Sequence, residues 1–273
     1  MDLVVVIPCH RRWDLLPAAI AAVGEHPVVV VNDAPPELAV RAPDGVTMVR
    51  TAGSQGFSRA VNVGLDAAQS HGASHVLLLN DDAQVEPGCI AALIAAWDER
   101  SGAVGPVLQD ASGAVASAGI ELAWWGRVRS RPVLPAAPAL VDALSGACLL
   151  IAAHERMDEG FVHGFEDIEL CRRLRQQGKS VRVVPAAQCR HLGGATLSRS
   201  SARAQRHAVS GHLRLLRRRR YVPVVVGLAL AQVLREGGPA VRVRGIAAGV
   251  ADWRTTAAAA PLPEGSPRPD QAP

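Results

Sequence analysis

The sequence of 273 residues predicts an α/β protein with a mainly parallel sheet flanked by helices. Short apolar runs of strand length alternate with segments that carry apolar residues at helical spacing. The runs at residues 3–7, 28–31 and 76–79 contain only Val, Leu and Ile, as strands buried on both faces do. Polar or glycine-bearing segments follow four strand candidates, and the carboxyl ends of parallel strands meet at one sheet edge, where ligands bind. These segments are residues 8–12, 32–33, 51–56 and 80–82.

The first half of the chain alternates strand and helix candidates. In the second helix candidate Phe57, Val61 and Leu65 are spaced i, i+4, i+8 and therefore share one face. Pro87 stands where Pro is common, at the start of a helix. This rhythm favours parallel strands joined by right-handed crossovers. The expected strands are residues 3–7, 28–31, 46–50 and 76–80, and the expected helices are residues 14–23, 53–70 and one that starts at Pro87.

The second half is less regular and contains one well-marked helix. In the segment 164–178 acidic residues fill the first turn, arginines follow, and Gly178 stands at the expected C-terminal cap. Residues 123–140 form a long proline-bearing loop, which in a compact domain is usually functional or mobile. The other strand candidates are residues 102–108, 146–152 and 180–184, with a hairpin arm at 113–122, a glycine-bearing loop at 188–196 and a basic helix at 201–218.

Composition excludes several classes of protein. With 49% hydrophobic and 20% charged residues the chain is globular, not disordered. Aromatic residues make up 3%, which argues against a protein that stacks nucleic-acid bases, so we expect no nucleic-acid partner. Five cysteines without a C-x-x-C pair argue against a disulfide framework and a zinc site and indicate a reducing compartment. The longest apolar stretch, residues 222–234, is shorter than the ~20 residues of a spanning helix, so we expect a cytoplasmic protein.

Two adjacent carboxylates, Asp81 and Asp82, follow the apolar run at residues 76–79 after a single Asn. Carboxylates are hard oxygen ligands of the kind that Mg²⁺ and Mn²⁺ prefer. The pair therefore indicates a metal–phosphate site, and a helix N-cap or solvated turn is the plainer interpretation. Asn32 and Asp33 occupy the same place after another strand, and they too are ordinary turn formers.

A second group of candidates lies apart from these strand ends. Glu166 and Asp167 begin the predicted helix, where a carboxylate can act as a general base or can stabilise the helix dipole. His191, close to two glycines, is either a metal ligand or a structural histidine. Arg12 and Arg59 are either surface charges or ligands for a diphosphate.

These motifs form a series whose order and spacing match a known pattern. The series is V-I-P-x-x-x-R at 6–12, V-N-D at 31–33, G-F-S-R-A-V-N-x-G-L at 56–65, L-L-L-N-D-D at 77–82, G-F-E-D-x-E-L-C-x-R-L-R at 164–175 and H-L-G-G-A-T at 191–196. The chain closely resembles the family 2 glycosyltransferases of GT-A fold, over roughly residues 3–220. Within them it resembles the rhamnosyltransferase and galactofuranosyltransferase-like group that builds bacterial polysaccharides, including those of the cell wall. The implied fold is the Rossmann-like GT-A fold.

The resemblance implies a role for each matching position. Asp33 would hydrogen-bond the nucleobase, as a carboxylate can with a uracil or thymine imide N–H. Asp82 and His191 would bind a divalent metal, Mg²⁺ or Mn²⁺, at the donor diphosphate. Asp167 would be the general base beside Glu166, and nearby cations would keep the pKa of Asp167 low. The other donor-binding positions would be Pro8, Cys9, His10, Arg12, Asn32, Arg59, Asn62, Asn80 and Asp81.

The implied activity is that of an inverting, metal-dependent hexosyl- or rhamnosyltransferase. It would move a sugar from a UDP- or dTDP-sugar to a hydroxyl of a glycan, lipid-linked or small-molecule acceptor. One alternative is a sugar nucleotidyltransferase, which would carry a glycine-rich, Lys-bearing segment near the first strand, where residues 8–14 read PCHRRWD. Another is a catalytically silent nucleotide-sugar-binding protein.

The expected domain organisation has three parts. Residues 1–213 form the glycosyltransferase domain, with a nucleotide-sugar half at about 1–110 and an acceptor half at about 111–213. Residues 214–256 form a basic amphipathic helical extension, and residues 257–273 an Ala- and Pro-rich disordered tail. Arginines in the extension would suit an anionic membrane surface, which predicts peripheral attachment to the inner face of the plasma membrane. A packed helix with solvated arginines is the alternative.

Overall fold

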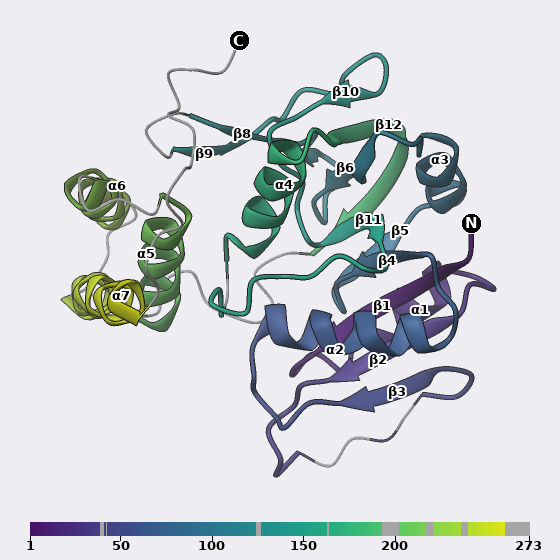
Figure 1. The fold of residues 1–273 in the computed structure, drawn as a ribbon, viewed down its shortest axis with the longest axis horizontal. Helices are drawn as coiled ribbons and strands as arrows, with labels where there is room; N and C mark the ends of the chain where they lie inside the picture. The colour runs from purple at the N-terminus through teal and green to yellow at the C-terminus, as the bar shows by residue number, and fades with distance from the viewer. Residues whose placement is uncertain are drawn as a thin grey trace. The chain divides into compact units, whose positions relative to one another are not determined.

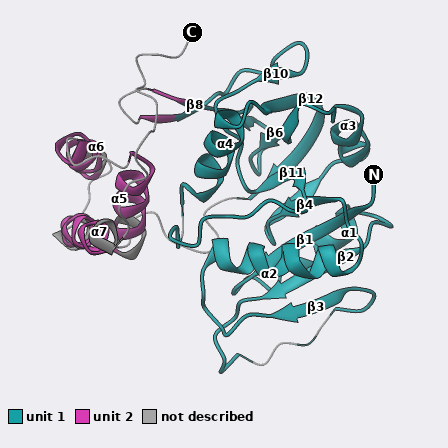
Figure 2. Cartoon of the chain, viewed as in Figure 1, with its two compact units in different colours: residues 1–121, 129–196 teal, residues 122–128, 197–273 magenta. Residues whose placement is uncertain are grey.

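The computed structural model of the chain describes residues 1–38, 41, 43–123, 127–162, 164–192, 202–216, 221–235 and 240–259. The chain divides into two compact units, Met1–Glu121 with Arg129–Thr196 and Leu122–Val128 with Leu197–Pro273 (Figure 2). Three regions used in the sequence predictions lie outside the described residues. They are the glycines after Leu192, the arginine run 217–220 and residues 260–273 of the predicted tail.

The first unit is built on a ten-stranded sheet with the order β10-β12-β6-β11-β4-β1-β2-β3, to which β5 and β7 are added beside β12 and β6 (Figure 1). β1 lies parallel to β2 and β4, and β2 lies parallel to β3, so the predicted α/β class is confirmed. β11 runs antiparallel to both β4 and β6, which makes the sheet mixed. The bounds are β1 Leu3–Cys9, β2 Val28–Asn32, β3 Thr47–Arg50, β4 His75–Leu79, β5 Ala83–Val85, β6 Ser101–Gln109, β7 Val115–Ser117, β10 Ala139–Leu140, β11 Cys148–Ala152 and β12 Ser180–His191. A separate two-stranded sheet pairs β8 (Ile120–Leu122) with β9 (Val128–Ser130).

β12 is longer than the sequence predicted. We expected a strand that ends at residue 184 and a loop from residue 188, but β12 continues to His191. Its first part pairs with β6, and its last part pairs with both β6 and β5 after a shift in register. Hydrogen bonds to two neighbouring strands hold the segment extended despite its weak apolar pattern. His191 thereby lies opposite Ala83, the residue after Asp82.

The described helices of the first unit are α1 (Leu16–Ala22), α2 (Phe57–Ser70), α3 (Cys89–Ala95) and α4 (Glu166–Gln176). α2 lies across β1 and β2 (Figure 1). Gly64 permits this close approach, because a Cβ at that position would lie 2.3 Å from Val6 Cγ1 and 2.8 Å from Val31 Cγ2. The glycine therefore sets how near α2 can lie to the strands whose ends carry the candidate site.

The apolar core of the first unit surrounds β1 and β4. Every residue of β1 and residues 76–79 of β4 are buried. Burying one such Val or Leu side chain contributes about 1.5–3 kcal/mol, so these strands form a stable support. The residues at the ends of these strands, starting at Cys9 and Asn80, are therefore fixed by the packing of the strands.

The second unit is helical and has its own small core. Its helices are α5 (Ala202–Leu216), α6 (Val222–Arg235) and α7 (Ala240–Ala259). α5 packs along α7, where a Cβ on Gly245 would lie 2.3 Å from the carbonyl oxygen of Ala202. The predicted domain boundary between residues 213 and 214 falls inside α5. Val209 and Leu213 of this helix are buried in the core of the second unit, so the helix belongs to that unit on both sides of the predicted boundary. Similarly, α7 extends three residues into the predicted tail.

The buried core of the second unit consists of Val209, Leu213, Val225, Val233, Ile246 and Trp253. No helix in the described part of the chain is both long enough and apolar enough to cross a membrane.

Candidate active site

Parallel pairing brings the polar ends of β1, β2 and β4 to one edge of the sheet. Cys9 lies opposite Asn32 in the register of β1 and β2, and the carbonyl of Cys9 accepts a hydrogen bond from the Asp33 N–H at 2.9 Å. The Cys9 thiol donates a hydrogen bond to the Asp81 carboxylate. Pro8 is buried within β1. The structure therefore brings these five predicted residues together at three neighbouring strand ends.

Asn80, Asp82 and His191 form a second group at this edge. His191 Nε2 lies 3.1 Å from Asp82 Oδ1 and 3.4 Å from Asn80 Nδ2. A single imidazole nitrogen can donate to the carboxylate or accept from the amide, but not both at once. Although Asp82 Oδ1 lies close to His191, the contact lacks hydrogen-bond geometry, and both Asp82 Oδ1 and Asn80 Oδ1 are buried without a hydrogen-bond partner among the described residues. Unpaired oxygens beside an imidazole are atoms that a divalent cation would satisfy.

The chain supplies only part of a coordination shell at this point. Across the described residues, no three His, Cys, Asp or Glu side chains gather as a metal site. Asp82 and His191 offer two ligands, and the Asn80 amide oxygen offers a third. Mg²⁺ in proteins commonly keeps waters and substrate phosphates as its remaining ligands. The residues present therefore fit a cation shared between the protein and a diphosphate.

Asp81 differs from Asp82 in its surroundings. Burial raises the pKa of Asp81 to about 6, and the charge of Asp82 adds to this shift. Burial, followed by the charge of Asp81, also raises the pKa of the Cys9 thiol far above its usual value. Cys9 is therefore a neutral hydrogen-bond donor. Asp81 is tied to β1, whereas Asp82 contacts β12.

The buried Asp33 carboxylate holds the loop that follows β3. Its Oδ1 accepts hydrogen bonds from the Thr51 hydroxyl at 2.6 Å and the Gln55 N–H at 2.8 Å, and its Oδ2 accepts one from the Gly56 N–H at 3.1 Å. Ser54 in this loop has a φ of 49°, a left-handed conformation that costs a non-glycine residue roughly 1–2 kcal/mol. The nucleobase contact predicted for Asp33 stays a prediction. In the structure both carboxylate oxygens bind the loop.

The side chains of three predicted donor-binding residues have partners within the protein. Arg12 donates two hydrogen bonds to Asp14, at 2.9 and 2.8 Å, and this contact lowers the pKa of Asp14. His10 Nδ1 lies 2.7 Å from the carbonyl oxygen of Asp33. The side-chain oxygen of Asn32 accepts a backbone N–H two residues later, which forms an Asx turn. Any donor contact by these side chains would share or replace these bonds.

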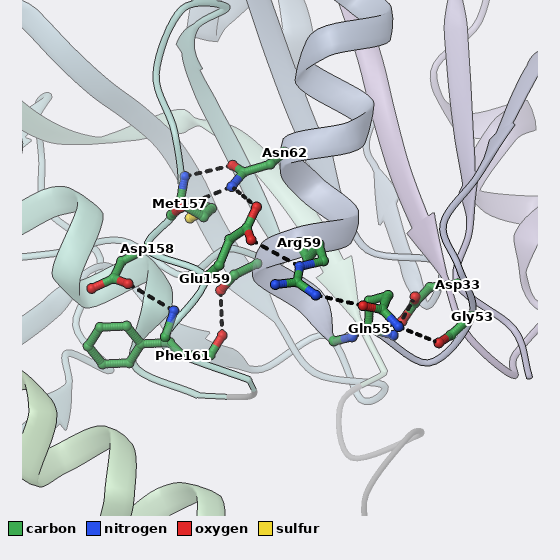
Figure 3. A network of polar contacts seen from close by, with 12 residues as sticks. Asp33, Gly53, Gln55, Arg59, Asn62, Met157, Asp158, Glu159 and Phe161 are labelled. Carbon is green, nitrogen blue, oxygen red and sulfur yellow. Dashed lines mark hydrogen bonds and ion pairs between the residues drawn. The ribbon is translucent and has the colours of Figure 1, made fainter. Parts of the chain in front are cut away.

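Arg59 and Asn62 join α2 to the loop before α4 (Figure 3), and the donor contact that we expected of them stays a prediction. Asn62 Oδ1 accepts the Met157 N–H at 2.9 Å, and Asn62 Nδ2 donates to the Met157 carbonyl at 3.0 Å. Arg59 Nε donates to Glu159 Oε2 at 2.9 Å. Asn62 is buried, so a direct donor contact would require its loop bonds to break. No motif indicates this role, because Glu159 stands outside all of them.

Glu166 and Asp167 lie in the first turn of α4, which follows Phe165 with a φ of 73°. Asp167 Oδ2 accepts the Gly146 N–H at 2.9 Å, and Oδ1 accepts the Ile168 N–H at 2.8 Å. Burial raises the pKa of Asp167 against the effect of these bonds, so the low pKa expected from nearby cations is wrong for the protein itself. Burial and the charge of Asp167 raise the pKa of Glu166 to about 8. Oε2 of Glu166 has no hydrogen-bond partner among the described residues.

Residues 146 and 147 connect two groups of candidate residues. The strand-end group is the set at the ends of β1, β2 and β4 together with His191, and the helix-start group is Glu166 and Asp167. The Asn80 N–H donates to the Ala147 carbonyl at 2.9 Å, while the neighbouring Gly146 N–H binds Asp167. A Cβ on Gly146 would lie 3.5 Å from both Asp167 Cβ and the Phe57 ring. The segment just before β11 thus sets the spacing between the two groups. Nothing in the sequence marked residues 146 and 147 for this role.

Comparison with known families decides the class of protein. The profile described as "Glycosyl transferase family group 2" matches residues 75–262, which is more than half of the chain. The chain belongs to the family 2 glycosyltransferases. A second profile, "Glycosyl transferase family 2", matches residues 4–132 of this glycosyltransferase and so covers the strand ends that carry Asp33, Asp81 and Asp82.

Solved structures confirm the predicted GT-A fold of this family 2 glycosyltransferase. It is similar to the crystal structure of GalNAc-T7 with UDP, GalNAc and Mn²⁺, with a TM-score of 0.61 and 17% identity over 79% of this chain and 47% of the other. It is also similar to the mannosyltransferase PcManGT from Pyrobaculum calidifontis in complex with GDP-Man and Mn²⁺, with a TM-score of 0.51 and 15% identity over 96% and 76% of the two chains. The chain thus spans about half the length of GalNAc-T7. Comparison with curated proteins gives no match.

Proposed function

We propose that this family 2 glycosyltransferase transfers a sugar from a nucleoside-diphosphate sugar to an acceptor hydroxyl, with inversion at the anomeric carbon and with a divalent cation. The observation that carries the proposal is the pair of neighbouring groups joined by Gly146 and Ala147. One group, around Asp82, offers ligands for a cation and a diphosphate. The other contains Asp167, whose carboxylate accepts the Gly146 N–H. This separation of roles suits the departure of a nucleoside diphosphate on one side and activation of an acceptor hydroxyl on the other.

Asp82 and His191, with Asn80, would hold Mg²⁺ or Mn²⁺. When bound, such an ion stabilises the negative charge of a departing diphosphate as a Lewis acid. The buried oxygens of Asp82 and Asn80 that lack partners support this assignment. The Mn²⁺ in the structures of GalNAc-T7 and PcManGT supports the choice of metal.

Asp167 is the proposed general base. The acceptor oxygen forms a bond to the anomeric carbon, the bond from that carbon to the diphosphate oxygen breaks with its electron pair on the diphosphate, and the hydroxyl proton moves to Asp167. The raised pKa of Asp167 improves it as a base, since a base works best with a pKa near the working pH. Glu166, whose pKa is raised to about 8, holds its proton at neutral pH and can donate a hydrogen bond beside the base.

The proposed donor is a UDP- or dTDP-sugar, and its base would lie at the ends of β1 and β2 near Asp33. The structures of GalNAc-T7 with UDP and of PcManGT with GDP-Man support a nucleotide in this fold and add GDP-sugars to the donors worth testing. The proposed acceptor is a glycan, lipid-linked or small-molecule hydroxyl. A hexosyl or rhamnosyl transfer in bacterial polysaccharide synthesis remains the finer proposal from the sequence resemblance.

Screening of UDP-, dTDP- and GDP-sugars tests this function. We expect the nucleoside diphosphate to be released when Mn²⁺ or Mg²⁺ is present, and this release to stop when a chelator is added. NMR of the product linkage reads the anomeric configuration, and inversion is expected. A nucleotidyltransferase would release pyrophosphate instead. No turnover, together with no rise in melting temperature with any nucleoside diphosphate and metal, would contradict the proposal and favour a silent protein.

We also propose that the second unit attaches this cytoplasmic enzyme to the inner face of the plasma membrane. α6 carries the exposed apolar side chains Val224, Leu230 and Leu234, and four arginines precede it in the sequence. An apolar helix that follows a run of basic residues in the sequence can bind anionic lipid surfaces. Sedimentation with phosphatidylglycerol vesicles, but not with phosphatidylcholine vesicles, is expected, and Leu234→Glu should weaken it. Equal sedimentation with both lipids would contradict the proposal.

A further inference from the structure

We propose that Glu159 is a positioning residue that couples the donor loop, residues 51–56, to the acceptor loop, residues 157–162. The proposal rests on the function proposed above, in which the donor base lies near Asp33 and Asp167 is the base. Neither loop contains a residue assigned to the chemistry. Glu159 would act only through the contacts that it makes.

A continuous chain of polar contacts runs from Asp33 towards Glu159 (Figure 3). Asp33 Oδ1 accepts the Gln55 N–H at 2.8 Å. The Gln55 side chain donates to the Gly53 carbonyl at 3.0 Å and accepts from Arg59 at 2.6 Å. Arg59 then donates to Glu159 at 2.9 Å. The donor loop is therefore tied to Glu159 by side chains of its own and of α2.

The two carboxylate oxygens of Glu159 accept hydrogen bonds from two different side chains of α2. Oε2 accepts from Arg59, and Oε1 accepts from Asn62 Nδ2 at 3.1 Å. Asn62 is in turn bonded to both the N–H and the carbonyl of Met157. These bonds to Arg59 and Asn62 lower the pKa of Glu159, so the carboxylate is ionised at neutral pH. The Glu159 carboxylate thus connects the polar contacts of the donor loop to the start of the acceptor loop.

The end of the acceptor loop packs on the first turn of α2. Ser58 Oγ donates to the Phe161 carbonyl at 2.7 Å, and the Phe57 N–H donates to the Val162 carbonyl at 3.3 Å. A Cβ on Gly56 would lie 2.8 Å from that same carbonyl oxygen, so only glycine fits here without a shift. Gly56 is also the residue whose N–H binds Asp33. One end of the donor loop and one end of the acceptor loop therefore touch directly.

The acceptor loop leads into Asp167. The turn before α4 uses Gly164 at φ 88° and Phe165 at φ 73°, after which Glu166 begins the helix. The Phe57 ring and Asp167 Cβ approach the same face of Gly146. A shift of residues 157–162 relative to α2 would therefore displace the base from the acceptor hydroxyl. Displacements of about 1 Å can reduce a rate by about 100-fold.

The chain also offers a matched control. Arg156 donates to Asp66 at 2.7 Å, which ties the residue before the acceptor loop to α2 by another exposed ion pair. Asp66 lies seven residues beyond Arg59, about two helical turns away, and has no bond to the donor loop in the described contacts. Asp66→Ala removes a similar ion pair without breaking the route through Glu159. A role of Glu159 in stability alone would make the two substitutions equivalent.

Hydrogen exchange of the full chain tests the coupling first, with UDP or GDP and Mn²⁺ as probes. Nucleotide should slow amide exchange in both 51–56 and 157–162 of the unaltered protein. In Glu159→Ala it should slow only 51–56, whereas Asp66→Ala should behave like the unaltered protein. Protection of 51–56 alone in the unaltered protein would overturn the coupling and leave the proposed function standing. No protection anywhere with either nucleotide would overturn both.

Kinetics with the donor found in the screen test the positioning role. Glu159→Ala should lower kcat by about ten-fold or more while the nucleotide dissociation constant changes less than about three-fold, because the base and not the donor is displaced. Glu159→Gln keeps one acceptor oxygen and should recover part of kcat. Asp66→Ala should leave both constants within about two-fold. Equal kcat in Glu159→Ala and Asp66→Ala at equal melting temperature would refute the assignment.

Discussion

The strand-end group and the helix-start group of this glycosyltransferase are built in opposite ways. Cys9, Asn32 and Asp81 stand at the ends of β1, β2 and β4, and the pairing of buried strands alone brings them together. Asp167 stands at the start of a helix and is held by Gly146 from a different part of the chain. The geometry of the first group is therefore set by the packing of the core strands. The second depends on loops, and we expect it to be the more sensitive to distant substitutions.

The largest expected effect separates the two groups by chemistry. Asp167→Asn removes the proposed base and should lower the transfer rate by about 10²–10⁴-fold, the usual contribution of general-base catalysis. The dissociation constant for nucleoside diphosphate with Mn²⁺ should stay unchanged, because the strand-end group is intact. Steady-state kinetics and calorimetric titration measure the two quantities. A variant that retains the full rate would remove Asp167 from the mechanism.

The second prediction tests whether the two adjacent aspartates differ as their contacts indicate. Asp82→Asn should weaken Mn²⁺ binding in the presence of UDP by at least about 100-fold. Loss of a residue that only hydrogen-bonds a metal ligand commonly lowers metal affinity by about 10- to 100-fold, and loss of a ligand itself should cost at least as much. Asp81→Asn should change it far less, because Asp81 is bonded to Cys9. Mn²⁺ titration followed by electron paramagnetic resonance measures both. Equal losses in the two variants would contradict the assignment.

A smaller effect concerns the donor loop at the edge of the strand-end group. Asp33→Asn replaces one of the two carboxylate oxygens with an NH₂ group. That group cannot accept a hydrogen bond from the backbone N–H donors of the loop. A hydrogen bond to a charged group contributes about 1.5–3 kcal/mol, so urea unfolding should show a loss of about 2 kcal/mol. Exposed Glu37→Gln, a few residues away, is the control and should change stability by less than about 0.5 kcal/mol. Unaltered stability in Asp33→Asn would mean that the loop is held by other contacts.

The last prediction is a change in the pH dependence of stability through Glu166. The unfolded chain releases this proton near 4.5 and the folded chain only near 8, so the folded state is favoured at low pH and loses stability as pH rises between these values. Glu166→Gln cannot ionise and should flatten this decline. Melting temperatures from about pH 5 to 9 measure the effect, and the variant should be relatively more stable at the alkaline end. An unaltered slope would show that Glu166 is ionised in the folded protein.

The fold class and the strand ends were predictable because they depend on local patterns. Buried runs such as residues 3–7 and 76–79 identify strands, and parallel pairing alone places the residues that follow them at one edge. The motif around Glu166 and Asp167 was also visible, since its acidic turn begins a helix. By contrast β12 reached His191 only through its pairing with β5 and β6.

The roles of Arg59 and Asn62 could not be predicted from their motif. Their partners, Met157 and Glu159, lie nearly a hundred residues away. A motif shows which residue types recur but not whether a side chain meets a ligand or another loop. The same limit applied to the pKa of Asp167, because its direction depends on burial that the sequence does not display.

The amino-acid sequence by itself determined the class of this protein, since apolar runs specify buried strands and the motifs at their ends specify a family 2 glycosyltransferase. Only the tertiary structure decided what each polar side chain touches. Hydrogen bonds such as that from Gly146 to Asp167 form between segments whose spacing in the chain carries no information about their distance in space. Packing of the core decides that distance, and with it the separation of the proposed cation site and the proposed base.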